Sequence, residues 1–172
     1  MLSSRIAALL ISLGFLAVGI GAWLSLVPDS TTALPHALFY LILIANTYFS
    51  IAFFSRIDAA TVPQRVLDVV LGANYLLLAA SIGRPALFES IGSSLFALAT
   101  IKYMLLVRIV NLKVVRRKIR IDLFGCGLCA AALAGSLIGY RLESAWAMTV
   151  VFAIANVYLL ILRPMYQPDD RR

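Results

Sequence analysis

The sequence predicts an all-α, polytopic membrane protein: a single domain over residues 1–172, built as a bundle of six transmembrane helices with both termini on the cytoplasmic side. Hydrophobic residues make up 62% of the chain and charged residues 13%, whereas soluble domains are about 45–50% apolar and about 25% charged. A soluble domain of this length would leave too much of that apolar surface in water. The chain also contains six separate apolar segments, each close to the roughly 20 residues that a membrane-spanning helix requires.

The six predicted spans are residues 6–27, 37–54, 66–83, 86–107, 121–142 and 145–162. Proline breaks helices because it lacks a backbone N–H, and all six prolines fall between or beyond these segments, so we expect none to interrupt a span. The first segment is too long for the 7–15 apolar residues of a signal peptide, which favours a retained helix. The connections on the outer face are short, and the first of them ends at His36, the only histidine.

Orientation follows from Lys and Arg, since both are enriched in the cytoplasmic loops of membrane proteins. Twelve basic residues lie on the face that holds both termini and the loops after the second and fourth spans: Arg5, Arg56, Arg65, Arg108, Lys113, Arg116, Arg117, Lys118, Arg120, Arg163, Arg171 and Arg172. Only Arg84 and Arg141 lie on the opposite face. This distribution predicts a cytoplasmic basic face, and the compact chain with short loops favours a bacterial inner membrane.

Polar residues within the spans are the candidates for a binding site, because polar side chains are costly in hydrocarbon and usually face the interior of a bundle. They are Asn46, Asn74, Lys102, Asn156 and, nearer the end of its span, Asp68. At about 1.5 Å per helical residue, Asp68, Lys102 and Asn74 lie ~4, ~10 and ~13 Å from the cytoplasmic ends of their helices. We therefore expect a Lys102–Asp68 pair with Asn74 nearby. These residues either hydrogen-bond between helices, with Lys102 extending toward the headgroups, or form a site for a solute or lipid headgroup in a cavity open to the cytoplasm.

Small residues recur at every fourth position in two spans. The fifth span carries Gly127, Ala131, Gly135 and Gly139, and the first carries Ala17 and Gly21, followed by Ser25. Such stripes allow helix backbones to approach closely, which is a main source of helix association in lipid. We favour packing within the bundle; the alternative is an interface with another membrane subunit or a second copy.

A basic run precedes the fifth span and contains Lys113, Arg116, Arg117, Lys118 and Arg120. It serves either as a topology anchor or as a docking surface for anionic lipid headgroups or an acidic partner, since each basic side chain near anionic lipid contributes about 1 kcal/mol. Nucleic acid is not an expected partner, because no aromatic residues accompany the charges and no binding module is present.

Nothing in the sequence predicts catalysis, a cofactor or a metal. No acid–base set of His, Asp or Glu can be assembled at one depth, and we expect no carboxylate deep in a span, which argues against a cation-coupled pump. Cys126 and Cys129 form a C-x-x-C pattern among apolar neighbours without further metal ligands, so we interpret them as packing residues. The favoured function is therefore a non-catalytic subunit or accessory factor of a membrane complex; the alternative is a carrier, flippase or channel for a small solute or lipid, and an intramembrane enzyme is the least favoured of the three classes.

Overall fold

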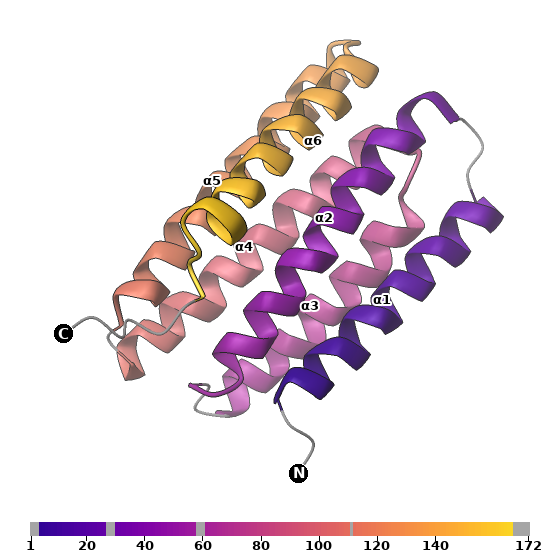
Figure 1. Cartoon of the computed structure of the whole chain (residues 1–172). Coiled ribbons are helices and arrows are strands. Elements are labelled where there is room, and N and C mark those ends of the chain that lie inside the picture. Colours follow the sequence, from indigo (N-terminus) through magenta and orange to yellow (C-terminus); the bar gives the residue numbers. More distant parts are fainter. Residues whose placement is uncertain (1–3, 27–29, 58–60, 111, 167–172) are drawn as a thin grey trace.

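The computed structural model describes residues 4–26, 30–57, 61–110 and 112–166. Its helices are α1 (Ser4–Leu26), α2 (Ser30–Phe54), α3 (Val62–Ala80), α4 (Pro85–Ile109), α5 (Lys113–Leu137), α6 (Arg141–Val157) and a π-helical turn, η1 (Tyr158–Leu162). No strand occurs in the part of the chain that the structure describes. Successive helices run in opposite directions, so the described chain begins and ends at the same end of the bundle (Figure 1). We call this the basic end, because the long basic run at the start of α5 lies there.

The predicted all-α membrane bundle is confirmed. Five helices are long and apolar enough to cross a membrane: α1, α2, α4, α5 and α6 with η1. The remaining helix, α3, is 19 residues long and carries Gln64, Arg65, Asp68 and Asn74, which lower its apolar character. It nevertheless packs along α1 and α4 as a full member of the bundle (Figure 1).

The outer surface of the bundle is apolar, as lipid requires. Large hydrophobic side chains point outward from every helix, including Leu10, Val69, Met104, Phe124 and Ile154. Water-soluble monomers rarely expose apolar patches beyond a few hundred Å². This surface therefore supports placement in a bilayer independently of the composition.

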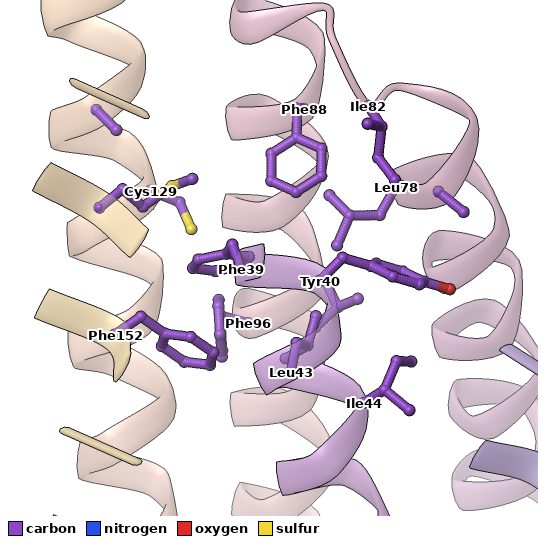
Figure 2. Close-up of a cluster of buried hydrophobic side chains, with 14 of the residues drawn as sticks. Phe39, Tyr40, Leu43, Ile44, Leu78, Ile82, Phe88, Phe96, Cys129 and Phe152 are labelled. Carbon is purple, nitrogen blue, oxygen red and sulfur yellow. The ribbon is translucent and has the colours of Figure 1, made fainter. Parts of the chain in front are cut away.

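The helices close into a ring in the order α1, α2, α6, α5, α4, α3, and α4 packs most extensively against α5. An aromatic cluster fills the middle of this ring (Figure 2). Phe39 stacks on Phe152 with ring centroids 4.4 Å apart and meets Phe88 and Phe96 edge-on at 5.8 and 6.5 Å. A smaller cluster around Phe54 and the ring of Tyr103 lies toward the basic end. The two clusters follow one another along the bundle axis.

Helix α2 begins at Ser30, before the predicted start of the span at residue 37. The expectation that no proline interrupts a span is therefore wrong for Pro35, which lies inside α2. Pro35 is the sixth residue of α2 and lies in its second turn, so its ring removes one of the first backbone hydrogen bonds of the helix and none from its interior. The hydroxyl of Thr149 on α6 donates to the Pro35 carbonyl at 2.8 Å. His36 consequently lies inside the bundle rather than in a loop, fully buried and stacked on Phe88 at 4.2 Å.

Helix α5 also begins earlier, at Lys113 instead of residue 121, and it ends at Leu137. The basic run is therefore the first two turns of a long helix rather than a loop. Helix α6 follows after a short connection in which Gly139 adopts a φ of 106°. A side chain is disfavoured at that angle, which explains the glycine.

Candidate functional site

A cavity of about 340 Å³ opens between the aromatic cluster and the basic end. Helices α2, α3 and α4 form most of its wall, with contributions from α1 and α5. Its polar and charged lining residues are Asn46, Thr47, Ser50, Ser55, Asp68, Tyr75, Lys102, Tyr103, Lys118 and Asp122. We call it the basic-end cavity. Cavities of this size and composition are the usual binding sites for small molecules.

One ion pair joins two helices at the exposed side of the cavity. The Lys102 ammonium on α4 contacts the Asp68 carboxylate on α3. The Asp68 side chain is 47% exposed and that of Lys102 15%, so this pair lies at the mouth of the cavity. The Lys102–Asp68 pair that the sequence predicted is therefore present in the structure. Asn74 takes no part, because its amide donates to the Val70 carbonyl of its own helix at 3.0 Å.

A second ion pair lies in the wall formed by α5 and is buried. Lys118 Nζ is 2.5 Å from Asp122 Oδ1, one helical turn away, and 5.6 Å from the centre of the Tyr103 ring. The second carboxylate oxygen of Asp122 has no hydrogen-bond partner among the described residues. This oxygen is buried, and it belongs to a residue that lines the cavity.

The burial of Lys118 corrects its assignment to a headgroup-docking surface. Buried positions of α5 include Val115, Lys118, Asp122, Gly125 and Cys129, spaced three or four residues apart. This spacing places Lys118 on the inner face of the helix. The other members of the basic run, Lys113, Arg116, Arg117 and Arg120, are exposed or half-buried.

Hydroxyl groups line the rest of the cavity in hydrogen-bonded pairs. Thr47 pairs with Tyr75 at 2.5 Å, and Ser50 pairs with Tyr103 at 2.8 Å. Each pair joins α2 to another helix, so the pairs hold the cavity walls together. A hydroxyl can donate and accept, so these groups can also exchange one bond for a bond to a ligand.

The predicted polar residues Asn46 and Asn156 have different environments. Asn46 lines the cavity and accepts a hydrogen bond from the Tyr166 hydroxyl at 3.2 Å. Burial raises the pKa of Tyr166, which keeps this hydroxyl protonated as a donor. Asn156 is buried on α6 away from the cavity, where its amide donates to the Phe152 carbonyl at 2.8 Å. Asn46, Asp68 and Lys102 are thus brought together, while Asn74 and Asn156 are not.

Two carboxyl groups that the sequence did not mark as candidates, Asp122 and Glu89, are buried inside the bundle. Asp122 and Glu89 both have 0% exposure. Glu89 lies on the far side of the aromatic cluster from the basic end and accepts a hydrogen bond from Ser136 at 2.7 Å. Glu89 is the fifth residue of α4 and Asp122 the tenth of α5, so each is buried by the neighbouring helices within the first three turns of its own helix.

The small-residue stripes do not form the helix contacts that we expected. Gly127, Ala131, Ala17 and Gly21 are exposed, and an added Cβ at Gly127 or Gly21 would meet no other group within 4 Å. The preferred interpretation as packing within the bundle is therefore wrong for these four residues. Gly135 does face another helix, at Ser144 of α6, whereas Gly139 lies in the connection after α5.

Close helix contacts instead use Gly125 and Gly92. An added Cβ at Gly125 would lie 2.8 Å from the Phe96 ring, and one at Gly92 would lie 3.1 Å from Cys129 Sγ. These two glycines allow the extensive contact between α4 and α5. Cys129 is buried in that contact and both cysteines are free thiols, in agreement with a packing role.

The chemistry of the cavity is set by its charged and hydroxyl groups. The described residues contain no group of three or more His, Cys, Asp or Glu side chains able to hold a metal ion. The cavity instead offers two ammonium groups, two carboxylates and several hydroxyls. No protein-family model, curated protein or solved structure matches the chain.

Proposed function

We propose that the protein is a multi-pass membrane carrier that binds a small zwitterionic solute in the basic-end cavity. The observation that carries this proposal is the presence of two Lys–Asp pairs, Lys102–Asp68 and Lys118–Asp122, around one cavity within a membrane bundle. Charged side chains inside a membrane bundle are costly, and they mark pathways for substrates or ions. Apolar residues would pack the same space at lower cost.

The size and charge of the cavity indicate the class of solute. About 340 Å³ is at the lower end of the range of about 300–1,000 Å³ for small-molecule sites. This volume suits a molecule of amino-acid size and is too small for the acyl chains of a lipid. Two lysines and two aspartates give a cavity without net charge, so a ligand with one cationic and one anionic group is favoured over a simple ion. Its anionic group would contact Lys102 or Lys118, and its cationic group the free oxygen of Asp122.

We place the basic end on the cytoplasmic side of a bacterial inner membrane. The orientation rests on the excess of Lys and Arg at that end, following the positive-inside rule. The cavity would then open to the cytoplasm at Asp68 and be closed on the other side by the aromatic cluster around Phe39. A carrier in this state would release or collect its solute on the cytoplasmic side.

The test is mass spectrometry of the full chain extracted gently from its native membrane. We expect a copurifying small molecule with both an amine and an acid group, released on denaturation. Because one charge left alone would harm folding, the matched variant replaces both members of the buried pair, Lys118→Met with Asp122→Leu. It should lose the small molecule, whereas the exposed control Arg108→Gln should retain it.

A mass spectrum that shows a bound partner protein and no small molecule would favour the second candidate, a non-catalytic subunit of a membrane complex. Gly127 and Ala131 are exposed on the outer face of α5 and would allow another helix to approach closely. A stable heteromer without any bound small molecule would contradict the carrier proposal and identify the partner directly.

A further inference from the structure

A groove on the outer surface of the bundle lies between α5 and α6, apart from the basic-end cavity. It has a volume of about 320 Å³ and is lined by Arg117, Arg120, Ile121, Phe124, Ala155 and Leu159. The lining changes in character along α5, from two arginines near the basic end to apolar side chains farther into the span. We call it the α5–α6 groove.

The two arginines supply a local positive charge that no described acidic residue offsets. Arg117 and Arg120 are three residues apart, so they project from the same face of α5. Neither forms an ion pair with a described residue, whereas Lys118, on the inner face, is neutralised by Asp122. Arginine binds phosphate through two parallel hydrogen bonds, and two arginines on one face can hold one phosphate group.

The floor of the groove is apolar, which suits contact with a lipid chain. Phe124 is one turn beyond Arg120, about 6 Å deeper along the helix, and its side chain is 55% exposed. On the other wall Ala155 leaves space because its side chain is small, and Leu159 lies in the π-helical turn η1. A π-helical turn widens a helix locally and often occurs at functional positions. Charge at the membrane surface followed by an apolar channel is complementary to an amphiphile with an anionic head.

We propose that the α5–α6 groove binds one anionic phospholipid of the surrounding leaflet, with its phosphate on Arg117 and Arg120 and an acyl chain along Phe124 and Ala155. This site does not depend on the carrier function. Of the basic run, Arg117 and Arg120 line this groove, whereas Lys118 faces the interior of the bundle and Lys113 does not line the groove.

The test is lipid binding to the purified full chain in detergent, measured by native mass spectrometry with phosphatidylglycerol and, as the neutral comparison, phosphatidylcholine. We expect one phosphatidylglycerol to bind at concentrations where phosphatidylcholine does not. Arg117→Gln with Arg120→Gln should weaken phosphatidylglycerol binding about 30-fold, from about fivefold for each basic residue. The control Arg108→Gln with Lys113→Gln removes the same charge from exposed positions at the same end and should change binding by less than about threefold.

A third variant separates the acyl-chain contact from the charge. Ala155→Leu fills the floor of the groove, keeps both arginines and should also weaken binding. Equal losses in the arginine variant and its control would show diffuse attraction and overturn the proposal, as would equal binding of the two lipids. A protein dimer that disappears in the arginine variant without dependence on lipid would identify a second copy as the occupant, which also overturns it. Because Arg117 and Arg120 lie outside the core clusters, their variant decides the question even if Ala155→Leu does not fold.

Discussion

Replacing Lys118 with Met should destabilise the protein far more than replacing Lys118 and Asp122 together. The single change leaves the Asp122 carboxylate buried at 0% exposure with neither oxygen bonded to a described cation. The double change, Lys118→Met with Asp122→Leu, removes both charges and fills a similar volume with apolar atoms. The comparison therefore separates the cost of an isolated charge from the net contribution of the pair.

The magnitudes follow from the burial of the pair. Removing one partner of a buried ion pair costs about 3–5 kcal/mol, whereas replacing both with apolar residues is often neutral. Lys118 also lies 5.6 Å from the centre of the Tyr103 ring, a cation–π contact of about 0.5–2 kcal/mol that both variants lose. We expect each single change to lower the free energy of unfolding by about 3–5 kcal/mol and the double change by no more than about 2 kcal/mol.

The assay is equilibrium unfolding in mixed micelles, followed by circular dichroism, for the wild type, both single variants and the double variant. Lys113→Met is the control, because Lys113 is exposed near the start of the same helix and should change stability by no more than about 0.5 kcal/mol. A double-mutant cycle then gives the coupling energy. If the two single effects simply add up in the double variant, the residues do not interact, and the Lys118–Asp122 ion pair in the α5 wall of the cavity is wrong.

Three further predictions test other parts of the bundle. Gly125→Ala should destabilise the protein by about 1–3 kcal/mol, because its Cβ would lie 2.8 Å from the Phe96 ring in the α4–α5 contact. Gly127→Ala is the matched control, and equal unfolding temperatures of the two variants would contradict the contact. In a background without native cysteines, Lys102→Cys should react with a membrane-impermeant thiol reagent added to the cytoplasmic face, and labelling from the opposite face alone would reverse the proposed orientation. His36→Phe should leave the unfolding temperature unchanged or raise it, because both ring nitrogens are buried without a described partner; a clear decrease would reveal a hydrogen bond to a group such as a buried water.

The helices and one ion pair could be predicted from the sequence because their signals are local. Long apolar segments define spans, and the depths of Asp68 and Lys102 can be counted along two neighbouring helices. Lys118 and Asp122 were not recognised as a buried pair because the basic run resembles a loop or a headgroup anchor when it is read by charge alone. The signal that could have found them is the spacing of Val115, Lys118 and Asp122, which marks one helical face.

Other features depend on the packing of distant segments and have no local signature. Pro35 is tolerated in α2 because it lies in the second turn, and the Thr149 hydroxyl that bonds its carbonyl is 114 residues away. The small-residue stripe at Gly127 has the right period for close packing, but the position of α4 directs Gly125 inward instead. Periodicity identifies a stripe, while only the tertiary arrangement shows which side of the helix meets a neighbour.

The weakly apolar character of α3 has a consequence for how the protein enters the membrane. A charged aspartate at the centre of a helix opposes insertion by the translocon by about 2.5–3.5 kcal/mol, less toward the helix end, so α3 with Arg65, Asp68 and Asn74 is a poor substrate by itself. Asp68 pairs with Lys102 on α4. Helix α4 follows α3 after a short connection and is itself strongly apolar. Biosynthesis is then expected to hold α3 at the translocon until α4 emerges and to release the two into lipid as one hairpin, with the ion pair that later borders the cavity already formed.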